Sequence, residues 1–482
     1  MDSRTMLLSV SGVLVLISLA CGESPAIQLI LNNKGLQYGK HIGAGWIQDK
    51  LELVTLPDIS GEVGVGIFGT VSYTLTGITI KKCDFPEPSA EFYQDAPGFK
   101  TSTMGLSVAI EGGWRTRYGI IRDHGSFQMA LFNVDVTSVV NLGKDPDGHL
   151  MVTSGGCAAR VGDINIHLQG GASWIIQPFL DHFKGHIRGA LEDKICPAVE
   201  EYILNLEYHL QAMNVSFNVN QDLTFDLPLS GSPIIDASSL NLGLKGEFYS
   251  TKSPTEPPFK AQPFTMPEQP SYMLLMGLSE FTLNSASYGY YSAGLLKAII
   301  NDSMIPPRSP VHLNTSSMGQ FIPQLPKLFP DLLMNLQVYA RELPLFAFLP
   351  GVVKLGFQGG IKAFAIQANG TQTPLFKLNV DSNFSSEVWI ADGKLKGSIK
   401  MNNFTLKLAA SEVGPFKTEK LEKLGGMVAS LAVAKLNGKL GEGVVLPRMK
   451  HAQLVNTALK VEQGFVAVFS DAQVLLTDRG FN

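Results

Sequence analysis

The stretch STKSPTEPPFKAQPFTMPEQP, residues 250–270, divides the chain into two halves of similar length. It contains six prolines, and each proline fixes φ and removes a backbone hydrogen-bond donor. Because neither a helix nor a central strand forms through such a stretch, we expect an extended, semi-rigid linker. On this division residues 23–245 are an N-terminal domain, residues 246–270 the linker, and residues 271–482 a C-terminal domain.

The first half alternates strand-like segments with helices. We expect a helix at about 33–51, followed by segments of strand period that include 65–80 and 126–140. A long helical stretch follows at 173–211, and we expect Pro197 to end one helix there and to open the next.

The second half repeats this plan loosely. A proline-broken segment at 325–336 precedes strand-like runs at 375–390 and 394–410, and a helical stretch occupies 418–440. Two strand-rich units, each with a long helix, predict an α+β fold with a duplicated architecture.

Composition and charge narrow the class of protein. Hydrophobic residues make up 45% of the 482 residues and charged residues 17%, as in a well-buried globular chain. The net charge of −4 argues against a nucleic-acid partner, which would need a basic domain. Residues 23–245 carry 15 basic against 24 acidic residues, a net of −9, whereas residues 246–482 carry 22 against 17, a net of +5.

The N-terminus has the pattern of a secretory signal peptide, expected over residues 1–22. Arg4 precedes an apolar run from Met6 to Ala20, which is too short to span a membrane, and small residues follow. We therefore expect a secreted, extracellular protein, or one stored in a secretory granule.

A secreted chain can carry disulfides and glycans. We favour a pair between Cys157 and Cys196, which leaves Cys83 as a reduced, buried thiol or as a partner of Cys21 if that residue survives cleavage. Spacing alone does not fix the connectivity. Six Asn-x-Ser/Thr sequons are candidate glycosylation sites: Asn214, Asn301, Asn314, Asn369, Asn383 and Asn403.

Two short motifs have a functional and a structural interpretation. GVGIFG at 64–69 matches the dinucleotide-binding glycine pattern, but a strand-like segment follows it where that motif needs a helix, so we interpret it as a glycine-rich turn. His182 and His186 have a spacing that can bind zinc, but no third ligand has motif spacing. The chain has no nucleophile elbow and no Cys-His motif, so we expect neither an enzyme nor a metal site.

WRTRYGIIR, residues 114–122, places three arginines beside a tryptophan in the acidic half. One interpretation is two strands that meet at a turn, with solvated charges. The other is a phosphate site, because the planar guanidinium matches phosphate in two hydrogen bonds at once. Asp123 and His124 follow directly and are expected to dilute the positive charge.

The apolar helix faces also leave two alternatives. They either pack on a sheet or border a groove for lipid, in which each buried CH₂ contributes about 0.8 kcal/mol. For the second alternative, candidate pocket residues are Ile42, Trp46, Ile175, Phe179 and Phe183.

Several stretches together resemble one known family. They are LKGEFYS (244–250), MGLSEFTLNSASYGYYSAGLLKAIINDSMIPP (276–307), LPRMKHAQLVN (446–456) and SWIIQPF (173–179). With the signal peptide and the linker, they resemble the bactericidal/permeability-increasing protein and lipopolysaccharide-binding protein family across nearly the whole mature chain.

The resemblance implies an elongated boomerang of two pseudo-symmetric barrels with long helices, joined by a central β-sheet and the linker. Each barrel would hold a phospholipid in an apolar pocket, and Cys157–Cys196 matches the family's disulfide. Members bind the lipid A part of bacterial lipopolysaccharide through a basic N-terminal tip. Trp114, Arg115 and Arg122 match the tryptophan and two basic positions of that tip.

This sequence also departs from the family. Tyr118 and Gly119 replace basic residues of the bactericidal members, Arg117 compensates once, and Lys50 is alone where those members have several lysines. The departures favour binding of lipopolysaccharide over killing. The expected function is therefore a secreted innate-immune protein that binds lipid A at the bacterial outer membrane surface through Trp114, Arg115, Arg117, Arg122 and Lys50, and that holds phospholipid acyl chains. The alternative is a carrier that moves phospholipid or neutral lipid between lipid particles, and a hydrolase is a distant third.

Overall fold

The computed structural model describes residues 24–51, 55–64, 69–173, 177, 180–252, 254–446 and 452–475. The expected signal peptide at 1–22 lies outside these ranges, as does most of the glycine-rich motif at 64–69. Within them, no helix has the length and the apolar character needed to cross a membrane.

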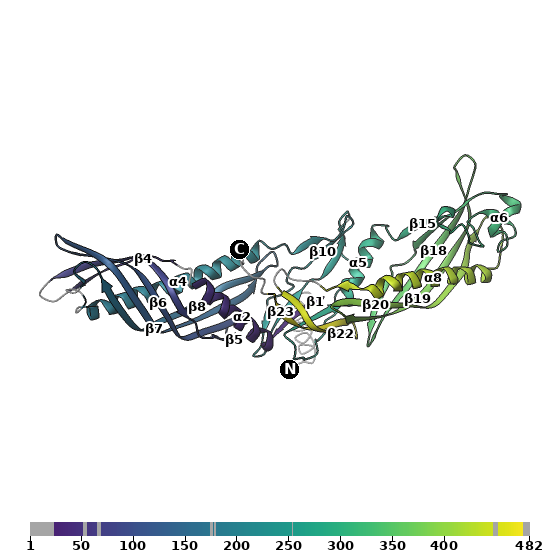
Figure 1. Cartoon of the computed structure of the whole chain (residues 1–482). Helices are drawn as coiled ribbons and strands as arrows, with labels where there is room; N and C mark the ends of the chain where they lie inside the picture. Colours follow the sequence, from purple (N-terminus) through teal and green to yellow (C-terminus); the bar gives the residue numbers. More distant parts are fainter. Residues whose placement is uncertain are drawn as a thin grey trace, which may run out of the picture.

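The molecule is elongated, with one large antiparallel sheet at each end and a six-stranded sheet between them (Figure 1). The central sheet takes strands from both halves of the chain. In spatial order they are β11 (Ile234–Ile235), β12 (Ser239–Leu244), β1 (Ile27–Asn32), β14 (Leu274–Ser279), β23 (Phe465–Val474) and β22 (Ala452–Glu462).

The N-terminal lobe is the sheet β2-β4-β6-β7-β8 with its helices. The predicted strand period is confirmed for residues 70–80 and 126–140, which belong to two of its long strands. In spatial order the strands are β2 (Thr55–Leu56), β4 (Thr70–Asp84), β6 (Gly98–Tyr118), β7 (Ile121–Lys144) and β8 (Leu150–Gln169), with β3 (Ile59–Gly64) on β4 and β5 (Ser89–Tyr93) on β6. The helices are α2 (Asn33–Leu51), as predicted, and α4 (Leu180–Gln211).

The C-terminal lobe repeats this arrangement. Its sheet has the order β15 (Lys297–Asn301), β16 (Met334–Ala340), β18 (Val352–Ile366), β19 (Gln372–Ala391), β20 (Lys394–Ser411) and β21 (Val444–Val445), with β17 (Leu345–Leu349) on β18. Its helices are α5 (Glu280–Ser292), η3 (Asp302–Met304), α6 (Thr315–Met318), α7 (Leu325–Leu328) and α8 (Glu419–Glu442). A small sheet of β9 (Ser216–Asn218), β10 (Leu223–Asp226) and β13 (Glu247–Ser250) lies between the lobes.

These elements make a mixed α+β fold of two lobes, but neither lobe is a closed barrel. In the described residues each large sheet is an open path, and no pairing joins its first strand to its last. The expectation of barrels is therefore corrected. A long helix, α4 or α8, lies along the last long strand, β8 or β20, where closure would have required another strand.

In the N-terminal lobe, side chains of α4 hydrogen-bond to the free edge of β8. Glu192 accepts the backbone N–H of Val161 (2.7 Å), and Glu207 accepts that of Val152. A free strand edge exposes unpaired backbone groups that can pair with another chain. These carboxylates satisfy such groups, so the helix substitutes for a neighbouring strand.

The C-terminal lobe uses the same arrangement. Glu422 of α8 accepts the N–H of Leu406 (2.8 Å). Fifteen residues later, Asn437 accepts the N–H of Ile399 (2.7 Å) and donates to its carbonyl (2.8 Å). Glu192 and Glu207 are also fifteen residues apart. We call these side-chain contacts between a helix and a sheet edge the edge latches.

The N-terminal latches flank a covalent link between the same two elements. Cys157 of β8 and Cys196 of α4 form the predicted disulfide, and Cys83 is a buried thiol in the core. Pro197 does not break the helix, contrary to the prediction, since α4 runs through it to Gln211. The packing of α4 on β8 and the adjacent disulfide hold the helix across the missing backbone hydrogen bond.

The proline-rich stretch is docked on the central sheet. Residues 254–273 have no helix or strand, as expected from their prolines. Phe264 stacks on Phe465 at 4.7 Å between ring centroids, and its carbonyl accepts the side-chain amide of Gln28 (2.7 Å). The stretch thus contacts strands from both ends of the chain.

Candidate functional site

The stretch WRTRYGIIR forms the end of the β6–β7 hairpin, as one of the two interpretations predicted. Tyr118 pairs with Ile121, and Gly119 and Ile120 make the turn. Gly119 has a φ of 56°, and a positive φ at the first central position is what a type II′ hairpin turn needs. Glycine adopts this conformation without a steric penalty, which accounts for its place here.

The three arginines share one face of the hairpin. Arg115 pairs with His124 across the strands, and Arg117 pairs with Arg122. Directly paired residues point to the same side of a sheet, as do residues two apart on a strand. All four side chains are exposed, so the hairpin presents three guanidinium groups and an imidazole together.

This charge is not neutralised within the hairpin. In the described part of the chain, no carboxylate forms an ion pair with any of the three arginines, and the Nε of Arg117 donates only to the carbonyl of Gly119 (3.3 Å). Asp123 belongs to the opposite face, where its carboxylate accepts the backbone N–H of Ala172 (2.6 Å) and of His124 (2.9 Å). Asp123 therefore lies off the arginine face, whereas His124, which was expected to dilute it, belongs to that face.

The end of the hairpin is apolar. Ile120 is 99% exposed and Ile121 is 63% exposed, and Tyr118 beside them is also exposed. We call Tyr118, Ile120 and Ile121 the apolar crest. Isolated exposed apolar residues are common on protein surfaces, but here they cluster directly beyond the arginines. The sequence alone does not reveal this role, because isoleucines in a strand-forming stretch are typical of a core.

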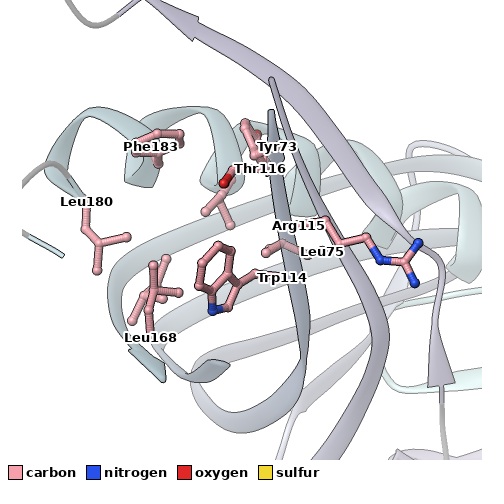
Figure 2. A pocket seen from close by; sticks show the side chains of 10 residues that line it. Tyr73, Leu75, Trp114, Arg115, Thr116, Leu168, Leu180 and Phe183 are labelled. Atoms are coloured by element: carbon pink, nitrogen blue, oxygen red, sulfur yellow. The ribbon is translucent and has the colours of Figure 1, made fainter. Parts of the chain in front are cut away.

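Trp114 lies in the interior, so the expectation that it meets a ligand at the surface is corrected. Its side chain is 2% exposed, and its Nε1–H donates to the carbonyl of Gln169 (3.3 Å). Strand alternation places it on the face opposite Arg115 (Figure 2). Its cross-strand partner is Gly125, where a Cβ would lie 2.1 Å from the Gln169 oxygen and 2.7 Å from the indole nitrogen. A glycine is thus required beside the indole.

Trp114 borders an apolar cavity between the sheet and the start of α4. The cavity has a volume of about 30 Å³, and Figure 2 shows Leu168, Leu180 and Phe183 around it, with the Arg115 guanidinium pointing away. Tyr73 packs edge-on against Phe183 at 5.6 Å, and burial raises the pKa of its hydroxyl. This volume suits one water molecule, so an acyl chain would enter only if α4 moved from the sheet.

The predicted pocket residues are only partly placed. Phe183 lines the cavity, whereas Ile42 is half-buried on α2 and does not. Ile175 and Phe179 lie outside the described residues, and so does the side chain of Trp46.

Other candidate residues lie elsewhere. Lys50 is in α2, but its side chain and that of His182 are outside the described part, and His186 is exposed. Of the sequon asparagines, Asn301 and Asn314 are half-buried, and Asn314 caps α6 by accepting the N–H of Ser317 (2.6 Å). The remaining four are exposed: Asn214, Asn369, Asn383 and Asn403.

The fold and the hairpin define a class: a two-lobed α+β protein, duplicated around a shared central sheet, with a basic hairpin on its N-terminal lobe. The N-terminal domain profile of the LBP / BPI / CETP family matches residues 35–213, and the C-terminal domain profile matches residues 218–474. The chain belongs to this family.

Individual relatives match along nearly their whole length. The bactericidal permeability-increasing protein of Sebastes schlegelii is 35% identical over 463 residues, which cover 96% of this chain and 98% of the relative. The lipopolysaccharide-binding protein of Bos taurus is 29% identical, over 95% of each chain. A crystal structure of lipopolysaccharide binding protein superposes with a TM-score of 0.58 at 25% identity, and the match covers 94% of this chain and all of that one.

Proposed function

We propose that this protein is secreted and binds the lipid A part of bacterial lipopolysaccharide through the arginine face of the β6–β7 hairpin. The observation that carries the proposal is the direct cross-strand pairing of Arg117 with Arg122. Like charges opposite each other in a sheet destabilise it. A doubly anionic phosphate removes that repulsion by accepting hydrogen bonds from both guanidinium groups.

The apolar crest gives the hairpin a second kind of contact. Lipid A joins phosphates to acyl chains, so a matching surface places cations next to exposed apolar side chains. Arg115, Arg117 and Arg122 would bind the phosphates while Ile120 and Ile121 reach the acyl layer. The buried Trp114 would act indirectly, by holding the strand that carries Arg115.

We further propose that the lobes hold phospholipid acyl chains between the helices and the sheets, and that the protein performs no catalysis. The apolar cavity beneath α4 supports the binding of acyl chains, because its walls are the side chains that an acyl chain would contact. Movement of α4 would enlarge it.

The first test is binding of the purified protein to immobilised lipopolysaccharide. We expect the variant Arg115→Ala/Arg117→Ala/Arg122→Ala to lose at least tenfold in affinity, since hydrogen bonds to charged groups contribute about 1.5–3 kcal/mol each. A matched control, Lys297→Ala/Arg308→Ala/Lys354→Ala, removes three exposed cations from the C-terminal half and should bind as the wild type does. Wild-type binding should also weaken as salt rises.

The second candidate function is a carrier of phospholipid or neutral lipid between particles. The net charge of −9 in the N-terminal half and the apolar cavity favour it. Equal binding by the wild type and the arginine triple variant, with phospholipid co-purifying, would support the carrier and contradict the hairpin proposal.

A further inference from the structure

The outward side of α8 is an unpartnered apolar surface. One side of this helix packs on β20, through the buried Leu421 and the edge latches. On the other side Met427 is 60% exposed and Leu431 is 67% exposed, and Val428 is exposed as well. A helix that only covered its sheet would be polar on this side.

Two further apolar side chains are exposed near the end of the helix. Val444 of β21, 73% exposed, pairs with the exposed Leu395 of β20. Trp389 on β19 is also exposed, but it pairs with Lys396 and therefore lies on the other face of the sheet from Leu395. We call the surface formed by Met427, Val428 and Leu431 the α8 strip.

Lysines accompany the α8 strip. Lys420, Lys423, Lys435 and Lys439 are all exposed, and none forms an ion pair within the described ranges. They belong to the half of the chain with a net charge of +5. An apolar stripe accompanied by lysines is the pattern of a helix that lies in the interface of a membrane.

The corresponding helix of the other lobe lacks these charges. The end of α4 also exposes apolar side chains, among them Tyr202 and Tyr208. Its neighbouring charges, however, are the exposed Glu200 and Glu201, and α4 has no lysine after Lys194. The basic character is therefore particular to α8 and is not a by-product of the duplicated fold.

We propose that the α8 strip docks on the surface of an anionic phospholipid bilayer. The apolar side chains would enter the boundary between headgroups and acyl chains, and the four lysines would contact the anionic headgroups. This contact is separate from the hairpin and does not depend on the function proposed for it.

The test is co-flotation with vesicles of phosphatidylcholine alone or with about 30% phosphatidylserine, an anionic content chosen to mimic a charged leaflet. The background is the arginine triple variant, so that hairpin binding does not contribute. Two variants probe the strip: Lys423→Glu/Lys435→Glu for its charge, and Met427→Gln/Leu431→Gln for its apolar contact. The matched control is Lys297→Glu/Lys354→Glu, with the same change in charge on β15 and β18, away from α8.

We expect the background protein to bind the anionic vesicles and not the neutral ones. Both strip variants should lose about tenfold or more in vesicle affinity. In Lys423→Glu/Lys435→Glu two charges near the surface are reversed, and in Met427→Gln/Leu431→Gln the apolar side chains that would enter the membrane are lost. The control should lose less than about twofold. Circular dichroism checks that the variants are folded. Equal binding by strip variants and control, or no binding by the background protein, would overturn the proposal while leaving the hairpin result intact.

Discussion

Arg117 and Arg122 face each other across two strands. We expect a substitution in this pair to change stability and binding in opposite directions. We expect Arg117→Thr to raise the free energy of unfolding by a few tenths to about 1 kcal/mol, because it removes a like-charge pair and adds a good strand former. The same change should weaken binding to lipopolysaccharide. Thermal unfolding at low salt and the binding assay measure the two effects.

Arg115→Thr is the matched control for that prediction, since Arg115 pairs with His124. It should weaken binding with a smaller gain in stability. A fall in melting temperature for Arg117→Thr would contradict the idea that the pair is retained for function at a cost in stability.

At the residue scale, part of this site could be predicted from the sequence. Strand period and the glycine placed the two strands and the turn at residues 114–122. The same period also places Trp114 and Arg115 on opposite faces, so the burial of the tryptophan was open to inference. The position of Asp123 was harder to predict, because its partner Ala172 lies on a loop that only the tertiary fold brings near.

At the scale of elements, we expect the edge latches to stabilise the contact between each long helix and its strand. Glu192→Ala leaves the backbone N–H of Val161 without its acceptor, and we expect a loss of about 1–3 kcal/mol in the free energy of unfolding. Glu192→Gln keeps an acceptor oxygen and should lose less. Urea unfolding measures the stability, and hydrogen exchange of the Val161 amide reports the latch directly.

The control for Glu192 is Glu200→Ala, which removes an exposed carboxylate from the same helix. Equal effects of the Glu192 and Glu200 changes, or unchanged exchange at Val161, would show that the latch does not hold the helix to the strand.

Helices α2 and α8 could be placed from the sequence to within two residues at each end, because no proline interrupts either segment. The bounds of helix α4 could not be predicted in this way, because a proline such as Pro197 breaks a helix unless tertiary contacts compensate. The contact of α4 with β8 cannot be inferred from the sequence. The edge latches could not be predicted either, since the sequence pattern of a helical glutamate is the same whether its side chain contacts solvent or a strand edge.

At the scale of the whole molecule, Asp471 of β23 connects segments from far apart in the chain. It accepts Lys34 Nζ of α2 (2.8 Å), the N–H of Met273 (3.1 Å) and the amide of Asn456 (3.2 Å). Burial alone would raise the pKa of Asp471, but these hydrogen bonds hold it below its ordinary value. In the unfolded chain the pKa of an aspartate is about 4. Because the pKa of Asp471 is lower in the folded protein, its charge stabilises the fold at pH values above about 4, and this stabilisation is lost as the pH falls through the folded pKa.

We therefore expect Asp471→Asn to lower the melting temperature at neutral pH, and the difference from wild type to shrink below about pH 4. Melting curves between pH 3 and pH 7 test this, with the exposed Asp392→Asn as control. A difference that stays constant with pH would contradict a role for the charge.

The duplicated α+β plan and the linker could be predicted at this scale, because composition and period change along the chain. The open sheets could not be predicted, since the same strand period fits a barrel and a curved sheet. The central sheet could not be predicted either, because β1 and β23 lie more than 430 residues apart in the sequence and are joined in the sheet through β14.

The seam between β1 and β14 has a consequence for a cleaved chain. Five residue pairs, from Ile27 with Leu278 to Leu31 with Leu274, join the two halves of the central sheet. A protease that cut the proline-rich stretch would leave an N-terminal fragment that contains β11, β12 and β1 and a C-terminal fragment that contains β14, β23 and β22. Each fragment would present the complementary strand edge of the other, so the nicked molecule would stay together. Separately produced halves would then reconstitute it, as a split protein does.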